Sequence, residues 1–110
     1  MANPFRGEVT LTLNGSSHTM KLTLGALAAL ETRLEAGSLM ELAERYEDGR
    51  IRASDLIALL SAGLMGGGHQ ISEEDLSSAN IEGGTLGAMK AGLALLAAAF
   101  QPAGPASNAD

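Results

Sequence analysis

Two short runs of alternating apolar and polar residues near the amino terminus constrain the fold most. Their apolar members are Val9, Leu11, Leu13, Met20, Leu22 and Leu24. Such alternation gives each strand one apolar face, and Asn14-Gly15 between the runs tolerates the positive φ of a hairpin turn. Ser16-Ser17 extends the turn and predicts a loop of about four residues. A lone hairpin is marginal in water, so the following helices must cover its apolar face.

Helix signals follow the hairpin without a long linker. Thr23, Ser38 and Ser72 are suited to cap helices, Ser54 or Asp55 opens another, and Thr85 begins the last. The predicted helices run over about 24–36, 38–48, 54–66, 72–81 and 85–100. The glycine run 66–68 predicts a helix stop and a flexible hinge.

These elements predict an α+β fold, with an N-terminal β-hairpin packed on a bundle of about four to five short helices. We expect one domain over residues 1–100 and a disordered C-terminal tail over residues 101–110, which lack periodicity. The predicted inward residues of the first and third helices are Leu24, Leu27, Leu30 and Leu34, and Leu56, Leu59, Leu60 and Leu64.

Composition excludes several classes of function. The formal net charge is −6 and the basic residues are scattered, which argues against a nucleic-acid partner. The chain contains no cysteine, which excludes disulfides and thiolate metal sites and fits a reducing cytoplasm. The amino terminus has no apolar core of a secretion signal, and no stretch has the roughly 20 apolar residues that a membrane span needs. We therefore expect a soluble protein without a membrane partner.

The residue types that carry catalysis do not form a recognisable pattern. His18, at the end of the hairpin turn, and His69, after the glycine run, have no companion ligands or nucleophile at a suitable spacing, so both are interpreted as ordinary loop residues. The acids of the second and fourth predicted helices, with Arg45 among them, are interpreted as a solvated face and capping carboxylates. We predict no enzymatic activity, metal, cofactor or small-molecule substrate.

The last predicted helix is apolar nearly all round, and Lys90 is its one charge. It is either the central strut of the bundle or a docking face for another protein. The second interpretation gives the candidate partner-binding residues Leu86, Met89, Leu93, Leu96 and Phe100.

Several segments together resemble the gene transfer agent family of tail-region proteins from alphaproteobacterial gene transfer agents and related prophages. They are the opening MANPFRGEV, the hairpin around Asn14-Gly15, LTLGALAALE, DLIALLSAGLMGGG and ISEEDL. The resemblance implies either a tail assembly chaperone that binds the tape measure or tail tube proteins, or a tube component that stays in the particle. The implied location is the bacterial cytoplasm during assembly or the finished tail. Two predicted strands favour the chaperone, because a tube ring usually needs a larger sheet. Self-association into a homo-oligomer also stays open.

Overall fold

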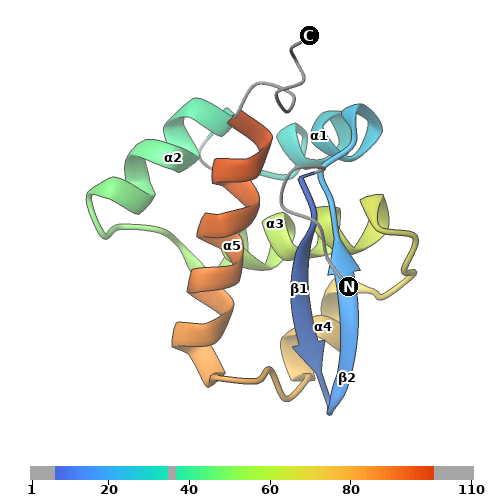
Figure 1. The fold of residues 1–110 in the computed structure, drawn as a ribbon. Helices are drawn as coiled ribbons and strands as arrows, with labels where there is room; N and C mark the ends of the chain where they lie inside the picture. The colour runs from blue at the N-terminus through green and yellow to red at the C-terminus, as the bar shows by residue number, and fades with distance from the viewer. Residues whose placement is uncertain (1–6, 35–36, 101–110) are drawn as a thin grey trace, which may run out of the picture.

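The computed structural model describes residues 7–34 and 37–100. Its elements are β1 (Val9–Leu13), β2 (Ser16–Met20), α1 (Leu24–Glu31), α2 (Leu39–Glu47), α3 (Ala53–Gly66), α4 (Glu73–Ser78) and α5 (Gly84–Phe100). A two-stranded antiparallel hairpin followed by five helices in this part of the chain confirms the predicted α+β class (Figure 1). The predicted tail, residues 101–110, lies outside the described residues, and the predicted domain limits stay predictions.

The hairpin turn is tighter than the sequence analysis expected. Leu13 pairs with Ser16, so only Asn14 and Gly15 form the turn, with φ values of 51° and 84°. Two successive positive φ values match the twist of the flanking strands better than a longer loop does. The predicted four-residue loop was therefore wrong, and the second strand begins at Ser16 and ends at Met20, before Leu22 and Leu24.

Helix α1 begins as predicted but ends early. The Thr23 hydroxyl accepts a hydrogen bond from the Ala26 backbone N–H at 3.1 Å, which confirms the cap. The helix ends at Glu31 instead of near residue 36. The predicted inward position of Leu24 was also wrong, because its side chain is 85% exposed while Ala26 and Leu30, four residues apart, face the core.

Two further serine caps are confirmed. The Ser38 hydroxyl accepts from the Glu41 N–H, and the Ser72 hydroxyl accepts from the Asp75 N–H. Helix α3 begins at Ala53, one residue before the predicted start, and all four of its predicted inward leucines are buried. No helix within residues 7–34 and 37–100 has both the length and the apolar character needed to cross a membrane.

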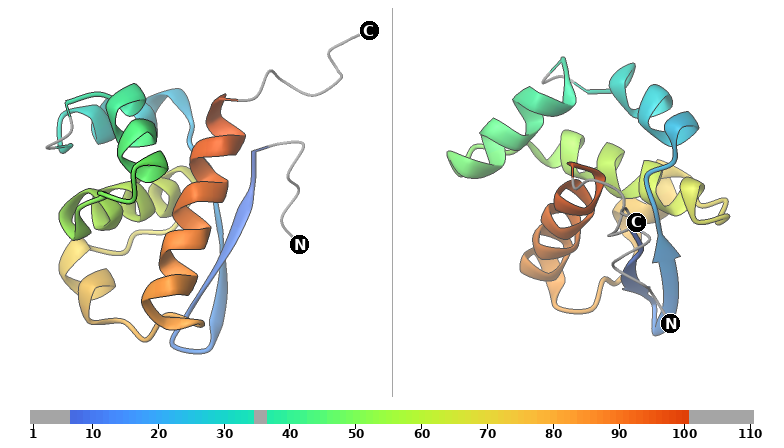
Figure 2. Two further views of the ribbon diagram at one scale, coloured as in Figure 1. Left: turned by 90° about the vertical axis from the view of Figure 1, so that its left-hand side faces the viewer. Right: turned by 45° about the horizontal axis from the view of Figure 1, so that its top comes forward.

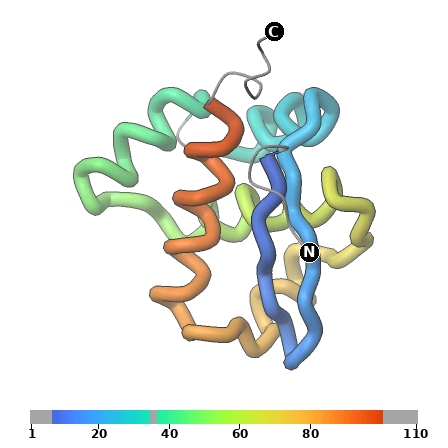
Figure 3. The backbone as a smooth tube through the Cα atoms, in the orientation of Figure 1, coloured from blue at the N-terminus to red at the C-terminus, as the bar shows by residue number. Residues whose placement is uncertain are grey.

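Helix α3 is the centre of the molecule. It contacts α1, α4, α5 and β2, while α5 also contacts β1. Figure 2 (left) shows α5 and the hairpin on the same side of α3, and Figure 3 traces the chain from the hairpin through the three helices to α4 and back along α5. The core that these elements share is built mainly from leucine and alanine.

The glycine run ends α3 against β2. Gly66 is the last helical residue and Gly67 is the cap, which confirms the predicted stop. A Cβ on Gly66 would lie 1.9 Å from the Lys21 carbonyl oxygen, and one on Gly67 would lie as close to the Thr19 carbonyl oxygen. The Lys21 N–H donates to the Gly63 carbonyl at 2.9 Å. The backbone of β2 and Lys21 therefore approaches Gly66 and Gly67 too closely for a residue with a Cβ. The predicted use of the glycine run as a hinge stays a prediction.

Candidate interaction surface

Helix α5 has two apolar faces with different surroundings. Ala88, Gly92, Leu95 and Leu96 are buried against the rest of the fold. The other face exposes Leu86, Leu93 and Phe100, whose side chains are 62%, 52% and 49% exposed. Residues seven apart in an α-helix drift by only about 20°, so these three side chains form one row along the helix, here called the α5 row. The row extends over roughly 21 Å at 1.5 Å per residue.

The structure places the five predicted partner-binding residues in different surroundings. Leu86, Leu93 and Phe100 form the α5 row, and Met89 is partly buried against the core. Leu96 is only 2% exposed and belongs to the core. The structure therefore leaves Leu96 no surface to offer a partner. Partner contact by the other four residues stays a prediction.

Tyr46 fixes the buried face of α5 against α2. Its hydroxyl donates a hydrogen bond to the Met89 carbonyl oxygen at 3.2 Å. Gly92 makes this approach possible, because a Cβ there would lie 2.3 Å from the Tyr46 hydroxyl and 2.9 Å from Leu56 Cδ1. Burial raises the pKa of Tyr46 to about 12, since the phenolate would lose its hydration. This contact holds α5 in the orientation that leaves the α5 row facing outward.

An ion pair between α2 and α3 was not predicted from the sequence. Arg45 Nη1 of α2 lies 3.7 Å from Asp55 Oδ2 of α3, and the Asp55 side chain is fully buried. The prediction of a solvated α2 face does not hold for Arg45, because this guanidinium turns inward toward α3. Asp55 was expected only as a residue near the start of a helix. The pairing of two residues on different helices has no local sequence signal.

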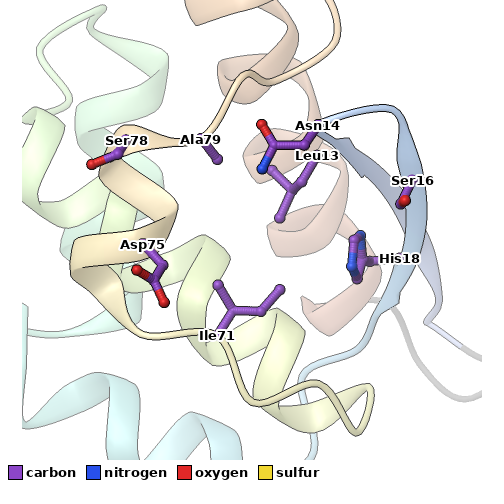
Figure 4. Close-up of a pocket in the computed structure, with 8 residues that line it drawn as sticks. All are labelled: Leu13, Asn14, Ser16, His18, Ile71, Asp75, Ser78 and Ala79. Atoms are coloured by element: carbon purple, nitrogen blue, oxygen red, sulfur yellow. The ribbon is translucent and has the colours of Figure 1, made fainter.

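The cavity beside the hairpin is lined by apolar and polar side chains from β1, β2 and the α4 region. It has a volume of about 540 Å³ and is lined by Leu13, Asn14, Ser16, His18, Ile71, Asp75, Ser78 and Ala79. Figure 4 shows Ser16 and Ser78 at opposite margins, pointing away from each other. The Ser78 hydroxyl donates to the Glu74 carbonyl at 3.2 Å. The two serines therefore do not converge, and no group of three or more potential metal ligands occurs among the described residues.

The two histidines lie together, which their positions in the sequence did not predict. Their rings make an edge-to-face contact with centroids 4.8 Å apart. His18 lies within β2, so its assignment to a loop was wrong, whereas His69 follows the end of α3. The pair joins β2 to the segment after the glycine run.

Comparison with known proteins gives one family. The model described as phage tail tube protein, GTA-gp10, matches residues 6–102. No curated protein and no solved structure matches the chain significantly. The match covers the hairpin and all five described helices.

Proposed function

This chain belongs to the phage tail tube protein family GTA-gp10, and from that membership we propose that it is a non-enzymatic protein of phage-like tail morphogenesis. We further propose that it acts as a tail assembly chaperone, which binds the tape measure or tail tube protein in the bacterial cytoplasm. The α5 row is the observation that carries this proposal. Three large apolar side chains aligned on one exposed helix face are typical of protein docking surfaces.

The small sheet supports a chaperone over a tube subunit. Within the described residues the sheet has two strands of five residues each. Closed rings of tube subunits generally rely on extended sheets whose edges pair between neighbours.

The alternative is a structural tail component that stays in the particle, and the description of the family favours it. Mass spectrometry of purified particles distinguishes the two. We expect the chain to be absent from mature tails and present in assembly intermediates. Recovery in mature particles in multiples of a ring would replace the chaperone proposal with the structural one.

Binding through the α5 row is tested by co-expression with the tape measure and tail tube proteins. We expect the double variant Leu86→Glu with Leu93→Glu to bind at least about 30-fold more weakly, because central apolar contacts of an interface carry about 2 kcal/mol or more. Leu24→Glu is the matched control, since Leu24 is an exposed leucine on another helix. Equal binding by the double variant and the control would exclude the α5 row as the docking surface.

A further inference from the structure

The outer edge of β1, on the side away from β2, makes only some of the backbone hydrogen bonds that a neighbouring strand would make. In a two-residue hairpin the residues flanking the turn exchange hydrogen bonds, so the backbone groups of Thr12 and Thr10 face away from β2. The Thr12 carbonyl accepts from the Glu82 N–H at 3.0 Å, and the Asn14 N–H donates to the Asn80 carbonyl at 2.8 Å. Residues 80–82 therefore pair with this edge as a neighbouring strand would, through the single bridge between Leu13 and Ile81.

This pairing stops after one bridge. Gly83 and Gly84 have φ values of 84° and 65°, which turn the chain away from β1 and into α5. The next outward-facing backbone groups along the edge are those of Thr10. They have no hydrogen-bond partner within residues 7–34 and 37–100, and Thr10 is exposed. The free donor and acceptor of Thr10 lie where another strand residue would pair.

A groove lies between this edge and α5. Its volume is about 390 Å³, and its walls include Thr10 and Thr12 on the strand and Leu86, Gly87 and Lys90 on the helix. Figure 1 shows α5 running beside β1 on the side away from β2. Leu86 belongs to both this groove and the α5 row, so a chain in the groove would cover part of the exposed row.

The charge of the groove also selects its occupant. Lys90 forms no ion pair with another described residue, and it lines the groove together with Glu82. A carboxylate on the occupant near Lys90 would supply the missing partner.

We propose that this groove binds an extended segment of the partner tail protein, which adds to the Thr10 edge as the next strand. The segment places an apolar side chain over Leu86 and an acidic one beside Lys90. Main-chain hydrogen bonds supply affinity in this mode, and alternate side chains supply specificity. The inference rests on the proposed function and deepens it, because it assigns an extended strand as the partner segment that binds.

Thr10→Pro tests the inference in the full chain. Proline removes the outward N–H but no hydrogen bond to β2, and edge strands tolerate proline at such a position. Thr10→Val is the matched control, because valine keeps the backbone donor and suits a strand. With co-expressed tape measure and tail tube proteins, we expect Thr10→Pro to bind about 10-fold more weakly and Thr10→Val to bind within about twofold of the parent chain. Circular dichroism verifies that both variants fold.

Hydrogen exchange gives an independent reading of the same contact. We expect the Thr10 amide to exchange freely in the isolated chain and to be protected in the complex.

If Thr10→Pro binds normally while Leu86→Glu with Leu93→Glu does not, the proposed function stands and the strand inference falls. If no chain binds either tail protein, both fall. Protection of Thr10 in the isolated chain would overturn the inference by showing an occupant from this chain. Dimerisation that Thr10→Pro abolishes would assign the edge to a second copy instead.

Discussion

Substituting Gly66 by alanine is expected to destabilise the fold strongly, although alanine favours a helix. The new Cβ would lie 1.9 Å from the Lys21 carbonyl oxygen, which is backbone and cannot rotate away. Restoring a contact distance of about 3.5 Å requires α3 and β2 to separate by more than ~1 Å. That separation would also strain the hydrogen bond from the Lys21 N–H to the Gly63 carbonyl.

The expected loss follows from these terms. Overpacking costs about 1–3 kcal/mol and the weakened hydrogen bond about 1 kcal/mol, while alanine at a helix end gains less than about 1 kcal/mol. We expect a net loss of about 2–3 kcal/mol in the free energy of unfolding. At about 4–8 °C per kcal/mol for a domain of this size, the Tm falls by roughly 10–20 °C.

Urea and thermal unfolding followed by circular dichroism measure the change. Gly25→Ala is the matched control, because Gly25 lies in α1 with no other side chain nearer than 4.0 Å to its added Cβ. We expect that control to gain up to about 1 kcal/mol. A Gly66→Ala chain within about 0.5 kcal/mol of the parent would refute the packing argument and return Gly66 to the role of a hinge.

Three further predictions concern separate parts of the fold. Tyr46 is the one tyrosine and the chain has no tryptophan, so absorbance titration reads it directly; we expect a pKa near 12 in the folded chain. Its contribution to stability is complete below about pH 10 and is lost as the pH rises toward 12, whereas titration near 10 in the folded chain would contradict its burial. Gly15→Ala should cost about 1–2 kcal/mol in urea unfolding, because its φ of 84° suits glycine. Leu59→Ala should cost about 2–5 kcal/mol but Leu24→Ala less than about 0.5 kcal/mol, and equal losses would contradict their opposite exposures.

Local sequence signals predicted where the helices start. Tertiary packing determined the features that the sequence did not predict. Thr23, Ser38 and Ser72 cap helices through contacts three residues away, which a sequence contains directly. Leu24 was predicted to face inward through successive three-residue steps to Leu27 and Leu30, but residues six apart lie about 120° apart around a helix, whereas Ala26 and Leu30 are four apart and share the buried face. The pairing of Arg45 with Asp55 depends on how two helices meet, and no local pattern encodes it.

For the candidate surface on α5, too, the sequence predicted some features and could not predict others. The apolar character of α5 predicted that some of its residues would remain exposed, and Leu86, Leu93 and Phe100 are exposed. When a helix is apolar nearly all round, its sequence does not show which side faces the core. The sequence therefore could not distinguish Leu96 from Leu93 as a core or a surface residue. The sequence did not predict the open edge at Thr10, because amino-acid composition does not show which backbone groups lack a hydrogen-bond partner.

The exposure of Leu86 and the open edge at Thr10 have one geometric cause. A strand beyond β1 would lie on the side of the hairpin where α5 runs, and Leu86 already lines the groove between them. Because residues 80–82 leave the edge after one bridge, both the backbone of Thr10 and the side chain of Leu86 remain without cover. A partner strand would satisfy the two together, since hydrogen bonds to the edge bring its side chains over the helix. Changes at Thr10 and Leu86 should therefore be coupled in a double-mutant cycle, and additive effects would show that the two belong to separate surfaces.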